Sequence, residues 1–190
     1  MGTLHTTDGA GSPHEDPGAV AVSVVRVGPE EWAAHRDLRL DMLRDAPEAF
    51  WASLEEVRAR TEQQWRQELR GPRIHLQARR GTEVLGGIAV LPEGYTPEHP
   101  IADHEIILAS LWVRPAVRGS GVSRALLDAA ARLSLDLGRP TVLLEVDDGN
   151  EPARGLYERL GFVETGVRHP RQAGGGAWVE YTITARDLLR

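Results

Sequence analysis

The chain has 190 residues and a formal net charge of −6, and it contains no cysteine and no lysine. Without cysteine it can form no disulfide, thiolate metal site or cysteine nucleophile, and without lysine it lacks the key side chain of Walker-type phosphate loops and Schiff-base enzymes. The acidic balance argues against nucleic acid as a partner.

The length and the hydrophobic share of 41% suit one globular domain. Residues 1–20 are rich in small, polar and proline residues and lack an apolar core. They predict a disordered tail rather than a secretory signal, followed by a single domain over residues 21–190. Because no stretch is apolar enough to cross a membrane, we expect a cytoplasmic protein with no membrane partner.

Alternating apolar residues and helical spacing, interrupted by Gly and Pro, divide the first half of the chain into short elements. In order, they are a strand over Ala21–Val27, a helix over Glu30–Arg44, an irregular or weakly helical stretch over Glu48–Ala59, a helix opened by the capping box Thr61–Gln64 and ending at Leu69, and a hairpin of strands Arg73–Arg79 and Glu83–Leu91.

The second half begins with a loop that contains three prolines. Its elements are this loop (Leu91–Asp103), a strand (His104–Val113), a helix (Val122–Leu137), an apolar strand (Thr141–Val146), a helix (Asn150–Leu160) and two strands (Phe162–Arg168 and Ala177–Thr184). The order predicts an α/β fold with a mixed sheet and helices on both faces. The strands before and after the helix over Val122–Leu137 should be parallel, with a right-handed crossover.

The turn between that first strand and the helix reads Arg118-Gly119-Ser120-Gly121-Val122-Ser123. The two glycines allow phosphate oxygens to approach the backbone closely, and they permit positive φ angles. The free amides of the turn act together with the positive end of the following helix. Such a turn suits a diphosphate, and Arg118 adds a cation. The alternative is an ordinary glycine-rich turn.

A second cluster, from Asn150 to Phe162, follows the apolar strand. Asn150 can cap the helix, and Pro152 fits its first turn. Tyr157 lies one helical turn after Ala153, where its simplest interpretation is a tyrosine at the edge of the core.

Together the two clusters resemble the GNAT superfamily of N-acetyltransferases, from Ala21 onward and most specifically from Ser110 to Phe162. The family's Arg/Gln-x-x-Gly-x-Gly/Ala turn reads Arg118-x-x-Gly121-x-Ser123 here, with serine in place of the usual last residue. The family's second motif is matched at Asn150, Ala153, Leu156, Tyr157, Leu160, Gly161 and Phe162.

The resemblance implies a largely antiparallel central sheet of about seven strands, in which the central parallel pair splays apart at a bulge. The pantetheine arm of acetyl-CoA would fill the gap, the Val113 N–H would polarise the thioester carbonyl, and Tyr157 would protonate the leaving thiolate. The implied cofactor-binding residues are Leu111, Trp112, Val113, Arg118, Gly119, Ser120, Gly121, Val122, Ser123, Asn150 and Tyr157. No metal is implied.

Acetyl transfer to an amine needs a base, because an ammonium group must first lose a proton. Glu105, at the start of a strand, and Glu145, within an apolar strand near its C-terminal end, are the candidates. Partial burial at the second position would raise the pKa of the carboxylate and make it a better base. Each could instead be an ion-pair partner or lie at the sheet edge. His104 is a weaker candidate.

The resemblance places the acceptor pocket between Asp45–Ser53, Leu91–Asp103 and His169–Gly176. Phe50 and Trp51 are candidate walls, with packing in the core as the alternative. Glu93, Glu98 and Asp103 could attract a cationic amine or simply form a solvated, charged loop. The expected acceptor is a small cationic metabolite or an aminosugar-type antibiotic. The final hairpin could pair two copies of the chain into a homodimer.

Three other functions stay open. The first is acetylation of protein or peptide N-termini, and the second is a non-catalytic acyl-CoA sensor on the same fold. The third is a dinucleotide oxidoreductase, suggested by Gly119-x-Gly121 and Glu145. The fingerprint of that class is poorly matched, because Arg124 stands at its third glycine position and five residues separate Val113 from Gly119.

Overall fold

The computed structural model describes residues 21–50, 52–96, 100–171 and 175–190. The strands are β1 (Ser23–Arg26), β2 (Ile74–Arg80), β3 (Glu83–Leu91), β4 (Glu105–Val113), β5 (Thr141–Asp147), β6 (Val163–Pro170) and β7 (Ala177–Thr184). The helices are α1 (Trp32–Asp45), α2 (Leu54–Arg58), α3 (Glu62–Arg70), α4 (Val122–Asp136), α5 (Glu151–Arg159) and α6 (Ala185–Leu188). The predicted tail, residues 1–20, lies outside the described residues.

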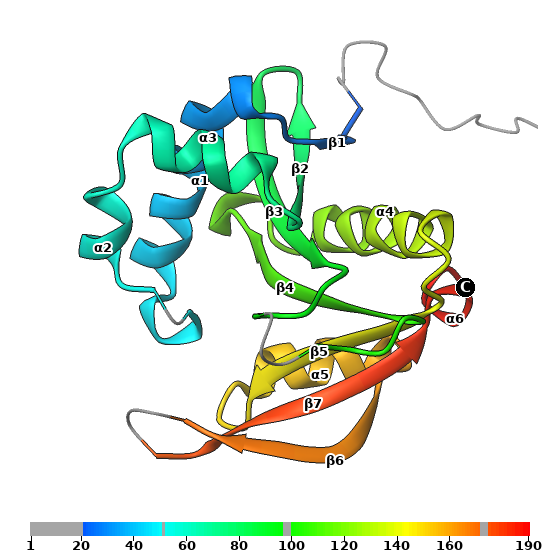
Figure 1. Cartoon of the computed structure of the whole chain (residues 1–190). Helices are drawn as coiled ribbons and strands as arrows, with labels where there is room; N and C mark the ends of the chain where they lie inside the picture. The colour runs from blue at the N-terminus through cyan, green and yellow to red at the C-terminus, as the bar shows by residue number, and fades with distance from the viewer. Residues whose placement is uncertain (1–20, 51, 97–99, 172–174) are drawn as a thin grey trace, which may run out of the picture.

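The strands form one seven-stranded sheet in the order β1-β2-β3-β4-β5-β7-β6 (Figure 1). Only β4 and β5 run parallel, and every other neighbouring pair in the described sheet is antiparallel. The prediction of a mixed, largely antiparallel sheet with a central parallel pair is confirmed. The parallel pair is joined through α4, which a parallel connection requires because it must cross a face of the sheet.

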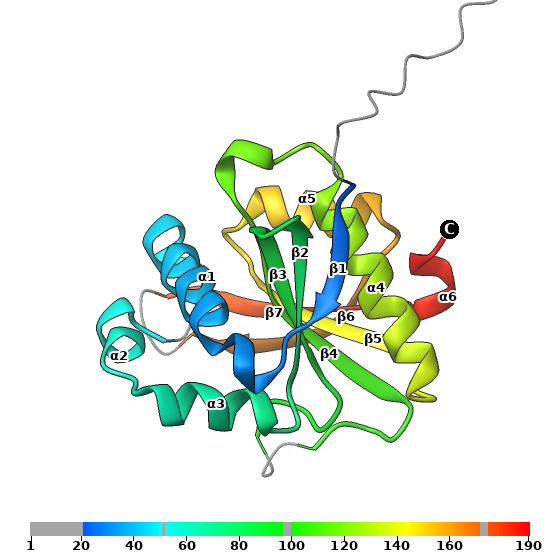
Figure 2. The same ribbon diagram turned by 90° about the horizontal axis from the view of Figure 1, so that it is seen from above.

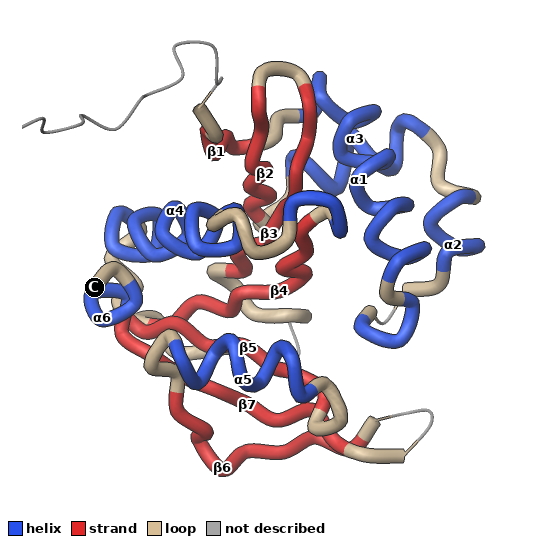
Figure 3. The backbone as a smooth tube through the Cα atoms, turned by 180° about the vertical axis from the view of Figure 1, so that it is seen from behind, coloured by secondary structure: helices blue, strands red, loops and turns tan. Residues whose placement is uncertain are grey.

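The central strands bury both faces, which explains their continuous apolar sequence. Ile106, Leu108 and Val142 belong to the core that packs against α4, whereas Ile107 and Leu143 pack on the opposite face. Each such buried side chain contributes about 1.5–3 kcal/mol through its removal from water. Helices α1, α2 and α3 lie on one side of the sheet and α4 on the other (Figure 2), and α4 and α5 share a side (Figure 3).

Local signals account for most of the boundaries. The capping box that opens α3 is confirmed: Gln64 Oε1 accepts from the Thr61 amide at 2.8 Å, and the Gln64 amide donates to Thr61 Oγ1 at 3.4 Å. The short helix α2 occupies part of the stretch predicted as irregular or weakly helical. The terminal helix α6 was not predicted; the Thr184 hydroxyl caps it by accepting from the Asp187 amide at 3.1 Å.

Strand β6 forms one edge of the sheet, and all its residues are exposed. Val163 and Val167 point apolar surface into solvent, with 60% and 41% of their areas exposed. In the part of the chain that the structure describes, each helix is too short or too polar to cross a lipid bilayer.

Candidate functional site

Strand β4 carries a bulge at Ser110, which has a positive φ of 56°. Its pairing with β3 changes register here: Ala89 lies opposite Ala109, whereas Gly87 lies opposite Trp112. A bulge inserts an extra residue and bends the strand, so β4 changes direction at this point. A non-glycine residue in the left-handed region is strained, and such strain is common at functional sites.

Beyond the bulge, β4 separates from β5. Parallel pairing joins Glu105–Leu108 to Thr141–Leu144 and then stops, although both strands continue. The Arg114 amide donates to the Leu85 carbonyl of β3 at 2.8 Å. Because N–H groups alternate between the two edges of a strand, the Val113 N–H faces away from β3 and toward the gap. The predicted splay is confirmed.

The turn before α4 has the backbone shape expected of an anion cradle. Gly119 and Gly121 have φ angles of 80° and 87°, and a Cβ atom added to either would meet open space. The Arg118 and Ser120 amides donate within the turn to Pro115 and Val117, at 3.2 and 3.4 Å. Among the described residues, no turn or loop carbonyl accepts a hydrogen bond from the Gly119 or Gly121 amide.

The first amides of α4, beginning at Val122, have no acceptor within their own helix. Together with the glycine amides they form a patch of donors at the positive end of the helix dipole. This patch keeps open donors for a diphosphate, although two of the predicted amides are already used by the turn.

A cavity of about 320 Å³ connects this turn with the splay and α5. Its walls include most of the predicted cofactor residues: Leu111, Trp112, Val113, Arg118, Gly119, Val122, Ser123 and Tyr157. Ser120 and Gly121 lie between wall residues in the turn but do not line the cavity themselves. We call this cavity the cofactor groove.

Tyr157 reaches the cofactor groove from α5. Its ring meets the Phe162 ring edge to face, with centroids 5.4 Å apart, and this contact fixes its direction. Burial raises the pKa of Tyr157 to about 12, so the hydroxyl keeps its proton at neutral pH. The side chain is therefore able to donate a proton or a hydrogen bond.

Asn150 caps α5 as predicted: its Oδ1 accepts from the Ala153 amide at 3.2 Å. The side-chain oxygen is thus engaged by the helix, while the side-chain NH₂ remains the group that could meet a ligand. Asn150 does not line the groove, and its predicted contact with the pantetheine arm stays a prediction.

Arg118 lies across the mouth of the splay. Its Nε donates to the Val113 carbonyl at 3.0 Å, and its Nη2 bonds to Asp45 at the end of α1. The Trp112 indole N–H donates to the same Asp45 oxygen at 2.8 Å. The Trp112 hydrogen bond, reinforced by Arg118, holds the pKa of Asp45 below its usual range. Asp45 was predicted only as part of an acceptor segment, not as a partner of Arg118.

Glu145 lies on β5, one residue beyond the last pair with β4. It shares a face with Leu143, because side chains two apart on a strand point the same way. Burial raises the pKa of Glu145, and the neighbouring charge of Glu180 adds to this, while His169 and a hydrogen bond from Tyr95 offset part of it. The His169 Nε2 is 3.6 Å from the Glu145 carboxylate. A partly buried carboxylate at the end of the paired region is placed to accept a proton.

Glu105, the other candidate base, lies at the opposite end of β4 from the bulge. Its carboxylate accepts from the Ala102 amide at 3.0 Å, and it pairs in register with Thr141. The neighbouring His104 is exposed, with its Nε2 3.9 Å from Glu105. The structure does not bring Glu105 or His104 to the cofactor groove.

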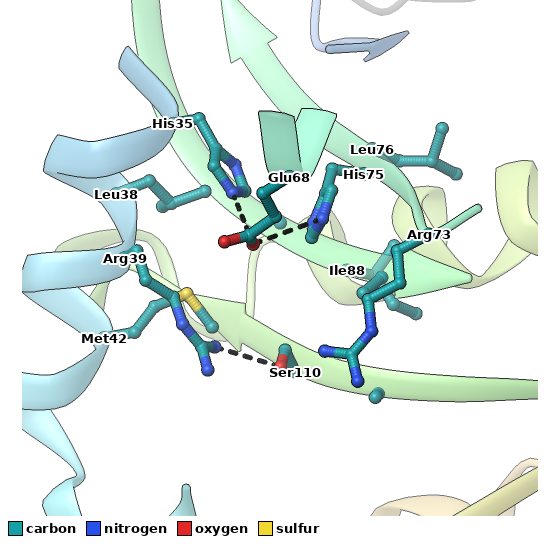
Figure 4. A pocket seen from close by; sticks show the side chains of 13 residues that line it. His35, Leu38, Arg39, Met42, Glu68, Arg73, His75, Leu76, Ile88 and Ser110 are labelled. Atoms are coloured by element: carbon teal, nitrogen blue, oxygen red, sulfur yellow. Dashed lines mark hydrogen bonds and ion pairs between the residues drawn. The ribbon is translucent and has the colours of Figure 1, made fainter. Parts of the chain in front are cut away.

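A second cavity, of about 40 Å³, lies between α1, α3 and the sheet, on the face opposite α4 (Figure 4). We call it the α1 pocket. It is lined by polar side chains that the sequence analysis did not single out, mainly His35, Arg39, Glu68, Arg73 and His75. No local motif connects them, since they come from α1, α3, β2 and the segment between α3 and β2.

The predicted acceptor segments border this side of the molecule only in part. Phe50 packs beside Leu38, Met42 and Trp112, and it does not line the α1 pocket. Tyr95, from the loop after β3, packs with the apolar cluster that includes Leu143. Trp51, Glu98 and residues 172–174 lie outside the described residues.

Comparisons with known proteins agree with this geometry. The family model described as "Acetyltransferase (GNAT) family" matches residues 36–162. A curated mycothiol acetyltransferase of Parafrankia sp. (strain EAN1pec) is 30% identical over 158 residues, covering 77% of this chain and 47% of that protein. The chain spans at most about half the length of such curated relatives.

Solved structures share the fold. The ribosomal-protein-S18-alanine N-acetyltransferase of Escherichia coli aligns with a TM-score of 0.61 and 18% identity, over 87% of this chain and 94% of that one. The yncA protein of Salmonella typhimurium, solved with its cofactor acetyl-CoA, aligns with a TM-score of 0.64 and 14% identity, again over 87% and 94%.

Proposed function

Because the chain belongs to the acetyltransferase (GNAT) family, we propose that it is an enzyme that moves an acetyl group from acetyl-CoA directly to a primary amine. The observation that carries this proposal is the splay between β4 and β5, which opens next to a turn with free amides. A flat, fully paired sheet would offer neither feature.

Two sets of backbone groups would bind two parts of acetyl-CoA, the diphosphate and the pantetheine arm. The amides of Gly119, Gly121 and the first turn of α4 would bind the diphosphate. The β4 edge at Leu111 and Val113 would pair with the amide groups of the pantetheine arm, as a strand edge pairs with an added strand. Arg118 would release the Val113 carbonyl when the arm binds.

The bound thioester supplies an electrophilic carbonyl carbon and a thiolate leaving group. The Val113 N–H would donate to the carbonyl oxygen and stabilise the negative charge that develops as the amine nitrogen attacks. The carbon–sulfur bond then breaks, and Tyr157 would give its proton to the departing sulfur. With no cysteine in the chain, no thiol is present to hold the acetyl group, which supports direct transfer.

Glu145 is our candidate for the base that takes the proton from the ammonium, directly or through a water molecule. Its pKa is raised by burial, and a carboxylate with a higher pKa is a stronger base. Glu105 is distant from the splay, so we do not assign it this role.

For the acceptor, we propose a small cationic amine, of which metabolites and aminosugar-type antibiotics are the candidates. Glu145 and Glu180 lie opposite each other on β5 and β7 and supply the negative charge that would attract an ammonium group. The curated relatives named mycothiol acetyltransferases support acetyl transfer to a small molecule.

We also propose a cytoplasmic protein that forms a homodimer. The exposed edge of β6, with Val163 and Val167 in solvent, supports pairing of two copies through the last hairpin. Light scattering on the purified chain tests this, and a monomer at micromolar concentration would contradict it.

Thiol release from acetyl-CoA across a panel of amines tests the proposed function. Since the protein has no cysteine, a thiol reagent gives no background from the chain itself. Mass spectrometry of the amine should show the added acetyl group. Tight coenzyme A binding with no turnover of any amine would favour the sensor, and turnover of peptide N-termini alone would favour the N-terminal acetyltransferase.

A further inference from the structure

The cofactor groove and the α1 pocket meet at the bulge of β4. Ala109 and Ser110 line the α1 pocket, and the next residues, from Leu111 to Val113, line the cofactor groove. A ligand group in the α1 pocket would therefore lie within a few residues of the expected thioester, since a strand advances about 3.3 Å per residue. The pocket is placed to bind part of the acceptor.

Arg39 brings a positive charge into this pocket without a matching carboxylate. Its Nη1 donates to Ser110 Oγ at 3.0 Å, and its guanidinium lies 5.0 Å from the centre of the Phe50 ring. Among the described residues, no carboxylate forms an ion pair with it. Burial lowers the pKa of Arg39, and the neighbouring charge of Glu68 offsets part of this shift. A half-buried guanidinium group that lacks an ion pair is a favourable binding site for an anion.

Arg73 is the second cation of the pocket. Figure 4 shows the guanidinium groups of Arg39 and Arg73 entering from opposite sides, with Ser110 between them. Arg73 donates to the Tyr95 carbonyl at 3.2 Å, and it too forms no ion pair within the described part of the chain. Each of these guanidinium groups carries the forked set of donors that matches a carboxylate.

Glu68, the carboxylate that lines the pocket, is already engaged. One of its oxygens accepts from Arg60 at 2.5 Å, and the other lies 3.5 Å from the Nε2 atoms of both His35 and His75. The single charge of Glu68 thus faces Arg60 directly and acts on Arg39 only from a distance, which leaves the pocket with more positive than negative charge.

Two histidines and a carboxylate are also the ligand types that a transition metal prefers. However, three arginines stand around this cluster: Arg39, Arg60 and Arg73. Their combined positive charge opposes a divalent cation and favours an anion.

We propose that the acceptor amine also carries a carboxylate, which Arg39 and Arg73 bind in the α1 pocket beside Ser110. The inference rests on the proposed acetyl transfer and, among small amines, selects an amino acid-like zwitterion over an aminosugar or a simple cationic amine. The ammonium end would lie toward Glu145, which is on the same face of the sheet. The pocket volume of about 40 Å³ suits a carboxylate rather than a sugar ring.

Matched acceptors test this substrate class. The probes are α-amino acids and straight-chain ω-amino acids, each compared with its carboxamide in the same thiol-release assay. We expect at least one amino acid to exceed its carboxamide by about tenfold to a hundredfold in kcat/KM, the value of a charge-assisted hydrogen bond. If the carboxamides or simple polyamines are acetylated equally well, the inference is wrong while the acetyltransferase stands. If no amine is acetylated, the proposed function itself fails.

Two variants locate the effect. Arg73→Met, at an exposed position with little risk to folding, should raise KM for the preferred amino acid by about tenfold and leave its carboxamide unchanged. Arg39→Met should do the same more strongly. Arg36→Met is the matched control, because Arg36 lies on the same helix but pairs with Asp37 in solvent. An unchanged KM for the preferred amino acid in both Arg73→Met and Arg39→Met would overturn the assignment.

Discussion

The cofactor groove and the α1 pocket share strand β4, but they offer different kinds of groups to a ligand. The groove presents mainly backbone groups, namely the β4 edge around Val113 and the amides of the turn at Gly119 and Gly121. The pocket presents side chains, in which Arg39 reaches Ser110 across 71 positions of sequence. Backbone groups can bind the same ligand in many sequences, whereas a set of side chains can change with the substrate.

This difference explains what could be predicted from the sequence. The turn before α4 and the cap of α5 are local, so a short stretch of residues specifies each of them. The splay was predicted from a family resemblance. Its physical cause, the bulge at Ser110, has no strong local signal because serine is not a typical residue for a positive φ.

The rest depends on contacts between distant segments. Asp45 meets Trp112 across 67 positions and Arg118 across 73. His35, Glu68 and His75 come together only when α1, α3 and β2 pack. No periodicity along the chain carries this information, so the α1 pocket was missed, and Glu105 and Glu145 could not be distinguished as bases.

The largest expected effect is on the chemical step in the groove. Replacing Tyr157 with Phe keeps the ring contact with Phe162 and removes the proton donor. Because general acid catalysis contributes about 10²–10⁴-fold, we expect kcat to fall by about a thousandfold with unchanged acetyl-CoA affinity. Steady-state kinetics and calorimetry measure the two quantities, and an unaltered kcat would remove Tyr157 from the acid role.

The next largest effect is expected for Glu145, which lies on the same face of the sheet as the α1 pocket. Glu145→Gln should lower kcat by about a hundredfold at neutral pH, at the lower end of general base catalysis because water can relay the proton. In the wild type, kcat/KM should fall as the pH drops through the raised pKa of Glu145, and the variant should lose this limb.

Stability gives a second readout of Glu145. A carboxyl group whose pKa is raised on folding costs stability above its pKa, where folding must bury the charge. Glu145→Gln should therefore unfold at a higher denaturant concentration than the wild type at pH 8, and less so at pH 4. If the variant and the wild type are equally stable at pH 8 and at pH 4, burial does not destabilise the charged form of Glu145.

A smaller effect is expected from the turn. Gly121→Ala places a side chain at a φ of 87°, and Gly138→Ala does the same at 71° beyond the other end of α4. Both should lose about 1–2 kcal/mol of stability, because left-handed backbone disfavours a Cβ atom. Only Gly121→Ala should weaken acetyl-CoA binding, by about tenfold. Equal affinities in the two variants would mean that the turn does not contact the ligand.

The smallest effect tests the link between the two regions. Asp45→Asn removes the charge that holds Arg118 across the Val113 carbonyl. Because Arg118 is about half exposed, the pair is weak, and the gain in acetyl-CoA affinity should not exceed about fivefold. Trp112→Phe, which removes only the indole donor to Asp45, is the companion variant. Weaker acetyl-CoA binding in Asp45→Asn would show that the Asp45–Arg118 pair stabilises the bound state instead.

A crystal structure of the chain with coenzyme A tests the account most directly. It predicts diphosphate oxygens on the amides of Gly119, Gly121 and the start of α4, with the pantetheine arm hydrogen-bonded to β4 between Leu111 and Val113. Arg118 should have left the Val113 carbonyl. Coenzyme A bound elsewhere, with β4 and β5 paired through to their ends, would contradict it.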